Sequence, residues 1–236
     1  MTHKAIFRQL WSDAFSAEAF QKRLHDPAMA GRWASWCLAA TLLPRRERLV
    51  CRELITAAGA AFPDIPEPEG GWSDYVLSDA TARLYPRHRR QATEAQEDFA
   101  LCTLLALQLL LDEERRQLPF SMTMDFAFCT AEEAADSPFY ERFLQVWRQD
   151  FVYELLRLSS ELTPFSTLQH SAMVHHVAMT AGRALRSSGA AVELALVSAA
   201  AAGHDIGKFG CMAGERVPYL HYYYTDDWLT RSGLPQ

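Results

Sequence analysis

Hydrophobic and polar positions alternate along this chain with the spacing of amphipathic α-helices. A first helical pattern begins at Ile6 and ends near Pro27. Similar patterns follow almost without interruption to the end of the alanine-rich segment before His204. The spacing predicts further helices at about residues 28–43, 44–61, 72–84, 93–116, 137–162, 163–187 and 190–204.

Two segments break the helical pattern. Residues 62–71 (FPDIPEPEGG) are rich in proline and glycine, which predicts a loop. Residues 120–128 alternate large apolar side chains with smaller or polar ones, and Thr130 with Glu133 resembles a capping box. Because a single strand has no partner, we interpret residues 120–128 as an extended connection. The expected fold is therefore all-α, a helical bundle of eight or nine helices.

The extended connection also suggests how the chain is divided. We expect residues 1–130 to form a helical region of unknown role and residues 131–236 to form the domain that carries the chemistry. One continuous helical body is the alternative.

Composition narrows the classes of function. The chain has 236 residues, 49% of them hydrophobic and 22% charged, which is typical of a globular protein with a substantial core. A net charge of −6 argues against general binding to nucleic acids or to anionic membranes. The five cysteines are widely spaced, which favours free thiols in a reducing cytoplasm. The longest apolar stretch, residues 99–111, is too short to span a membrane, and the sequence leaves homo-oligomerisation open.

The most specific signal is the segment His204–Asp205–Ile206–Gly207–Lys208. A His-Asp pair alone occurs by chance in roughly a quarter of chains of this length. The addition of Gly-Lys lowers the chance rate to about one in a thousand. A second histidine, His170, lies one predicted helical hairpin upstream.

Helical spacing suggests how these residues could meet. His170, Val174, Ala178 and Ala181 share one face of their helix, and this face is small and apolar below His170. The small residues of segment 198–203 would let a neighbouring backbone approach closely, and Gly207 could terminate that helix. His170, His204 and Asp205 would then converge on one divalent cation, for which Mn, Fe, Mg, Ni and Zn are all candidates.

These motifs resemble the HD superfamily of metal-dependent phosphohydrolases, helical proteins with the pattern H…HD…D. The resemblance covers about residues 163–225 and places HD-like helices in the C-terminal third. It implies metal binding by His170 and the His204–Asp205 doublet, with Asp205 also orienting a metal-bound water. The HDIGK form is similar to bacterial signalling and nucleotide phosphohydrolases, which implies that Lys208 neutralises substrate phosphate. His221 matches a second-metal histidine found in some HD subfamilies.

The chain departs from the family in one respect. The last metal-binding aspartate of the family lies several tens of residues after the doublet, and here only Asp226 and Asp227 follow, which are too near to take that role. We therefore expect this sequence to be a fragment with an incomplete site. The leading hypothesis is a phosphohydrolase acting on a phosphomonoester or phosphodiester, with a nucleotide or another phosphorylated small molecule as substrate. The alternatives are a non-catalytic regulatory, nucleotide-sensing or scaffolding module and a plain protein-interaction bundle.

Other conspicuous residues have simpler interpretations. His175 and His176 lie about 140° and 240° around the helix from His170, which indicates surface or interhelix positions. The tyrosine-rich segment 219–224 with Trp228 favours core or interface packing over a wall for a nucleotide base. The basic runs 45–48 and 87–90 are typical of solvated helix ends.

Overall fold

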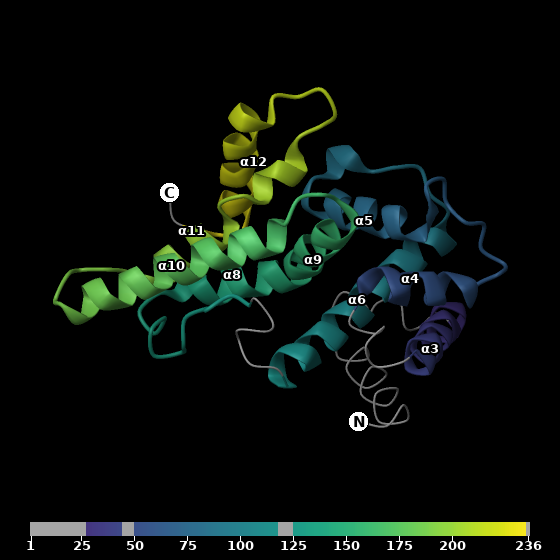
Figure 1. Cartoon of the computed structure of the whole chain (residues 1–236), viewed down its shortest axis with the longest axis horizontal. Coiled ribbons are helices and arrows are strands. Elements are labelled where there is room, and N and C mark those ends of the chain that lie inside the picture. Colours follow the sequence, from purple (N-terminus) through teal and green to yellow (C-terminus); the bar gives the residue numbers. More distant parts are fainter. Residues whose placement is uncertain (1–26, 44–49, 118–124, 235–236) are drawn as a thin grey trace.

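A computed structural model describes residues 27–43, 50–117 and 125–234 of the chain (Figure 1). In these segments all regular structure is helical, and no strand occurs. The all-α prediction is therefore confirmed. Nine α-helices fall within the described segments: α3 (Pro27–Leu42), α4 (Cys51–Ala60), α5 (Gly71–Leu84), α6 (Glu94–Gln117), α8 (Pro138–Gln149), α9 (Val152–Leu162), α10 (Thr167–Ser187), α11 (Leu194–Gly203) and α12 (Val217–Arg231).

Most helix boundaries follow the sequence pattern. The loop predicted at 62–71 separates α4 from α5, and α5 begins where Gly70 and Gly71 adopt positive φ angles of 85° and 86°. Glycine takes this left-handed conformation at little cost, so the chain can turn sharply there. The helix predicted before residue 27 and the beginning of the one predicted at 44 lie outside the described residues.

The prediction of a single helix over residues 137–162 is wrong. The chain forms α8 and α9 instead, separated at Asp150 and Phe151. Phe151 has a positive φ of 54° and is buried in the core, while the Asp150 carboxylate accepts a hydrogen bond from Trp228 Nε1 at 3.1 Å. Tertiary packing therefore ends α8 at a point where the helical periodicity continues.

The helices share one continuous hydrophobic core. It extends from Met29 and Trp33 in α3 to Trp228 in α12, and α4 and α5 both pack against α9. These contacts cross residue 130. The division into units 1–130 and 131–236 stays a prediction.

The segment before α8 forms an extended connection, as expected for its described part, residues 125–129. Phe126 is buried there, in contact with the rings of Trp147 and His175. The capping box is also present. The Thr130 amide donates to Glu133 Oε2 at 2.9 Å, and the Glu133 amide donates to Thr130 Oγ1 at 3.2 Å.

Candidate metal centre

The candidate site lies where α11 leads into a short 3-10 helix, η3 (Ile206–Gly210). Helix α11 ends at Gly203, with His204 as its C-terminal cap and Asp205 at the start of η3. Gly207 was expected to terminate α11, and this prediction is wrong. Gly207 lies inside η3 and is not among the residues with positive φ.

Three predicted ligands converge here. His170 Nε2 lies 3.0 Å from Asp205 Oδ2 and 3.2 Å from His204 Nε2, and His204 Nε2 lies 3.4 Å from the same Asp205 oxygen. His170 comes from the first turn of α10, one hairpin away from the doublet. The structure thus brings His170 next to a doublet that begins 34 positions later in the sequence.

These separations match those of ligands that share a cation. Atoms bound about 2.1 Å from one ion lie roughly 3.0 Å apart in octahedral and 3.4 Å apart in tetrahedral coordination. Two imidazoles and a carboxylate are suited to Zn, Mn, Fe or Ni. The residues present therefore fit a divalent cation.

The histidine rings are also oriented for metal binding. His204 Nδ1 lies 2.8 Å from the carbonyl oxygen of Ala201, and His221 Nδ1 lies 2.6 Å from that of Val217. A carbonyl oxygen only accepts, so Nδ1 donates in both rings. In a neutral ring this leaves the Nε2 lone pair free, which is the arrangement that supports metal-binding histidines. The sequence analysis missed these backbone contacts.

Asp205 is the electrostatic centre of the site. Its carboxylate is nearly buried, and Lys208 Nζ lies 2.5 Å from Oδ2. Burial acts to raise the pKa of Asp205, but hydrogen bonds from His204 and Lys208 outweigh it and hold the pKa well below its usual value. The pKa of His204 is raised, mainly by its hydrogen bond to Asp205, although burial acts to lower it. Asp205 is therefore ionised at neutral pH.

His221 approaches the same carboxylate from α12. Its Nε2 lies 3.8 Å from Asp205 Oδ1, and its side chain is largely buried. The group whose ligand atoms all lie within 4.8 Å of one another consists of His170, His204 and Asp205 among the described residues. A ligand role for His221 stays a prediction.

Helix α12 is fixed to the site by contacts that the sequence did not reveal. Thr225 Oγ1 accepts a hydrogen bond from the Gly207 amide at 3.0 Å and donates one to the His204 carbonyl oxygen, also at 3.0 Å. A β-carbon at Gly207 would collide with the backbone of His221 and would lie 2.6 Å from Thr225 Oγ1. The glycine of the HDIGK motif thus allows two backbones to meet.

The prediction that His170, Val174, Ala178 and Ala181 form the packing face of α10 is only partly correct. Val174 and Ala178 are half-buried, whereas His170 and Ala181 are exposed. The fully buried positions of α10 lie on a different arc: Leu168, Ser171, Ala172, His175, Met179 and Gly182. Because α10 packs against both α9 and α11, its buried arc faces both neighbours and leaves His170 at the solvent edge.

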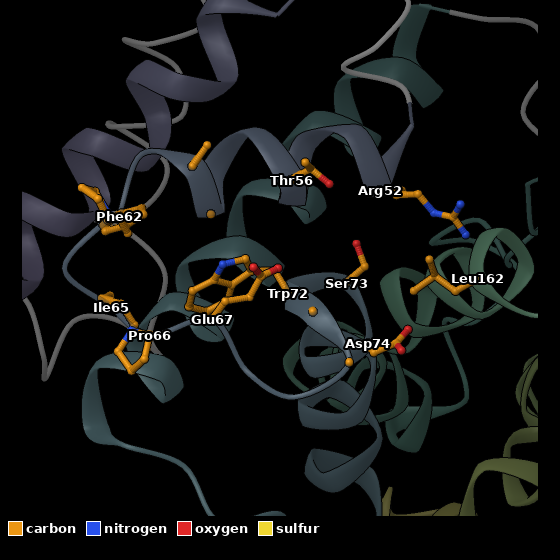
Figure 2. A pocket seen from close by; sticks show the side chains of 15 residues that line it. Arg52, Thr56, Phe62, Ile65, Pro66, Glu67, Trp72, Ser73, Asp74 and Leu162 are labelled. Carbon is orange, nitrogen blue, oxygen red and sulfur yellow. The ribbon is translucent and has the colours of Figure 1, made fainter.

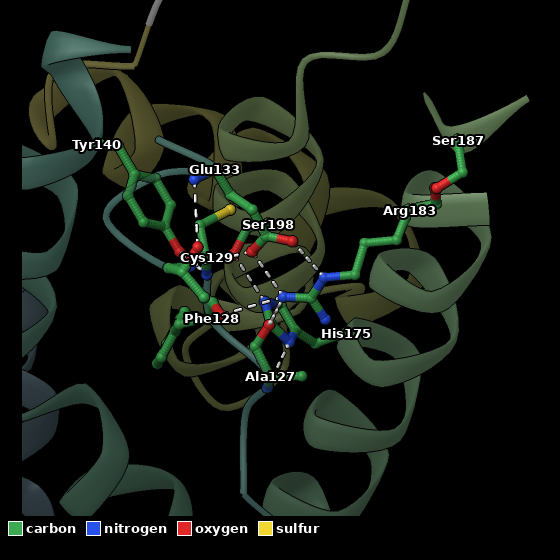
Figure 3. Close-up of polar contacts among 10 residues, drawn as sticks. Ala127, Phe128, Cys129, Glu133, Tyr140, His175, Arg183, Ser187 and Ser198 are labelled. Atoms are coloured by element: carbon green, nitrogen blue, oxygen red, sulfur yellow. Dashed lines mark hydrogen bonds and ion pairs between the residues drawn. The ribbon is translucent and has the colours of Figure 1, made fainter. Parts of the chain in front are cut away.

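His175 has the interhelix position that its helical angle predicted, and it is completely buried (Figure 3). Its Nδ1 accepts a hydrogen bond from the Ala127 amide at 3.1 Å, so Nε2 donates to Ser198 Oγ in α11 at 2.9 Å. The Ser198 hydroxyl in turn lies 2.7 Å from that of Tyr140. Mainly through burial, the pKa of His175 falls to about 4. His175 is therefore neutral and joins the two helices that carry the predicted ligands.

The tyrosine-rich segment has two parts in the structure. Tyr224 and Trp228 are buried, as expected for core residues. Tyr219, Tyr222 and Tyr223 instead expose 72%, 67% and 66% of their surface, so they lie outside the core of the chain, and interface packing stays a prediction for them.

Two arginines of the basic run 87–90 form ion pairs with acidic side chains of the same chain. Arg87 pairs with Glu215 and also contacts Tyr224, and Arg89 pairs with Glu97 at 2.8 Å. Arg87 and Arg89 thus have partners of their own, in line with the interpretation as solvated helix ends. The other run, residues 45–48, lies outside the described residues.

A separate hollow of about 760 Å³ lies among the N-terminal helices (Figure 2). Arg52, Trp72 and Asp74 line it, together with Glu67. The Arg52 guanidinium contacts the Glu161 carbonyl oxygen at 3.5 Å, and the lining charges are of mixed sign. The hollow includes none of the predicted ligands, so the candidate site rests on the histidine and aspartate cluster instead.

Comparison with known proteins identifies no relative of this chain. No family model, curated protein or solved structure matches the chain. In the described part of the chain, no helix is both long enough and apolar enough to cross a membrane.

Proposed function

We propose that this chain forms the metal centre of an HD-type phosphohydrolase that cleaves a phosphomonoester or phosphodiester. The observation that carries the proposal is the convergence of His170, His204 and Asp205 on one point, with ligand atoms 3.0 to 3.4 Å apart. A divalent cation held there would lower the pKa of the water it binds and stabilise negative charge on phosphoryl oxygens.

The openness of the site supports catalysis over a structural role. Structural metal sites are closed by four protein ligands, whereas catalytic sites have three and keep a position for water or substrate. Among the residues that the structure describes, the cluster offers three ligands, and the His170 side chain is 52% exposed. A phosphate could therefore reach the cation from solvent.

The remaining roles follow from position. Asp205 would be one of the residues that hold the cation, and its carboxylate would also help to orient the attacking water. Lys208, whose side chain is 40% exposed, can rotate from Asp205 toward a bound phosphate and neutralise its charge. His221 supports the carboxylate or serves as a further ligand. We place this activity in the cytoplasm, in bacterial signalling or nucleotide metabolism, on a nucleotide or a similar small phosphate ester.

Metal analysis of the purified chain tests the proposal. After incubation with Mn²⁺ and removal of excess metal, we expect about one ion per chain by inductively coupled plasma mass spectrometry. His204→Ala should lower the affinity at least tenfold, because it removes one of three ligands. His176→Ala is the matched control, because His176 lies on the same helix as His170 but outside the cluster.

Turnover is measured separately on bis(p-nitrophenyl) phosphate and on nucleoside mono-, di- and triphosphates. Metal-dependent release of phosphate or p-nitrophenol that His204→Ala abolishes would support the enzyme. Binding of metal and nucleotide without hydrolysis would indicate a sensing module. Absence of stoichiometric metal would refute the proposal.

A further inference from the structure

An exposed aromatic ring lies directly beside the candidate metal centre. The ring of Tyr222 packs against that of His221, with ring centroids 3.8 Å apart and planes tilted by 38°. His221 Nε2 in turn lies 3.8 Å from Asp205 Oδ1. Tyr222 is nevertheless 67% exposed, so most of its surface is open to solvent.

The helical geometry of α12 distinguishes Tyr222 from the other exposed tyrosines. Thr225 marks the face toward the site, since its hydroxyl donates to the His204 carbonyl. At about 100° per residue, Tyr222 lies about 60° from Thr225 around the helix. Tyr219 and Tyr223 lie about 120° and 160° away, and the Tyr223 ring contacts Tyr224 instead. Of these three tyrosines, Tyr222 is the nearest to the metal-site side.

The Tyr222 ring contacts His221 on one side, and 67% of the residue's surface faces solvent. An exposed aromatic face beside a phosphate site is suited to stacking with a flat ring of the ligand. Lys208 and the candidate cation would hold the phosphate, and Tyr222 would contact the ring attached to it. The two interactions together select phosphate esters that carry an aromatic group.

We propose that Tyr222 is the base-stacking platform of this site and that the substrate is a nucleoside phosphate rather than a simple sugar phosphate. This inference rests on the proposed function for the location of the phosphate. The inference identifies the base of the substrate, which the metal cluster does not contact. Tyr222 contacts the base and takes no part in the chemical step.

Calorimetric titration of the whole chain in Mn²⁺ tests this, with AMP and ribose 5-phosphate as probes that differ by the base alone. The wild type should bind AMP at least tenfold more tightly than ribose 5-phosphate. Tyr222→Leu should weaken AMP binding about tenfold and leave ribose 5-phosphate unchanged, whereas Tyr222→Phe should bind AMP as the wild type does. Tyr219→Leu and Tyr223→Leu are matched controls on the same helix and should leave both affinities unchanged.

The outcomes separate this inference from the proposed function. Equal binding of the two probes by the wild type, or AMP binding by Tyr222→Leu at wild-type affinity, would overturn the stacking role. AMP binding that depends on Tyr222, without any hydrolysis of AMP, would support the platform and count against the enzyme. Failure to bind either probe would overturn the stacking role, while the metal analysis and the turnover assays decide the proposed function separately.

Discussion

At the scale of single residues, His175 shows how a side chain in a helical core can be polar and still stabilise the fold. It is fully buried, and each ring nitrogen has a hydrogen-bond partner, one in the extended connection and one in α11. A buried polar group without partners would destabilise the fold by about 1–3 kcal/mol. The ring must also remain neutral, because burial disfavours its charged form and the nearby Arg183 adds to this effect.

This burial predicts an acid-sensitive stability. The pKa of His175 is about 4 in the folded chain against 6.5 for an ordinary histidine. Above pH 6.5 the ring is neutral in both states and its contribution is fully present. As the pH falls from 6.5 to 4, the unfolded chain takes up a proton and the folded chain does not. The free energy of unfolding should therefore fall by about 3 kcal/mol by pH 4.

His175→Gln isolates this effect, because an amide can accept from Ala127 and donate to Ser198 without titrating. Urea unfolding of both proteins between pH 7 and pH 4 gives the measurement. The stability difference between wild type and variant should change by about 3 kcal/mol across this range. A difference that stays constant with pH would show that His175 is not the titrating group.

The cluster of candidate ligands was predictable at this scale because the motif determines its residues. His170, His204 and Asp205 came from residue type and spacing, and the structure brings them together. The ring orientations were not predictable, since they depend on which carbonyl each Nδ1 meets. Helical angles alone argued against His175 as a ligand but could not identify its partners.

At the scale of elements, the contact between η3 and α12 depends on Gly207. Gly207→Ala would force the α12 backbone away from η3 and strain the hydrogen bonds of Thr225. We expect a loss of roughly 1–3 kcal/mol in stability, together with weaker metal binding, because His221 and His204 would both shift. Thermal unfolding and Mn²⁺ titration give the two readouts.

Gly31→Ala is the matched control for Gly207→Ala. Gly31 lies within α3, and a β-carbon there would meet nothing within 4 Å. Alanine is favoured over glycine in a helix interior, so this variant should be more stable by about 0.5–1 kcal/mol. Equal effects of the two substitutions would contradict the close approach at Gly207.

The periodicity of hydrophobic residues predicts the helices well, but it does not predict where a helix is interrupted. Helices α3, α5 and α6 begin and end within about two residues of the predicted ranges. The break at Phe151 was missed because nothing in the local sequence requires it. It is caused by burial of the Phe151 ring and by the bond from Trp228, a residue 78 positions away from Asp150. Long-range packing of this kind lies outside any local pattern.

At the scale of the whole molecule, the described helices on both sides of residue 130 are held together by specific bonds. The Tyr85 hydroxyl donates to the Tyr224 carbonyl at 2.9 Å, and Arg231 Nη2 donates to the Leu84 carbonyl at 2.9 Å. Both join the end of α5 to α12. The N-terminal helices therefore support the helix that also carries His221 and Tyr222.

This continuity predicts that a defect far from the site loosens it. In α4, a β-carbon at Gly59 would lie 2.6 Å from Trp72 Nε1, so Gly59→Ala should destabilise the N-terminal helices by about 1–3 kcal/mol. If one core unfolds as a cooperative unit, hydrogen exchange by mass spectrometry should show faster exchange in α12 as well as in α4 and α5. Faster exchange confined to residues before 130 would show instead that the chain consists of two independent units. Since α4 and α5 both pack on α9 within one hydrophobic core, we expect the defect to spread to the candidate metal centre.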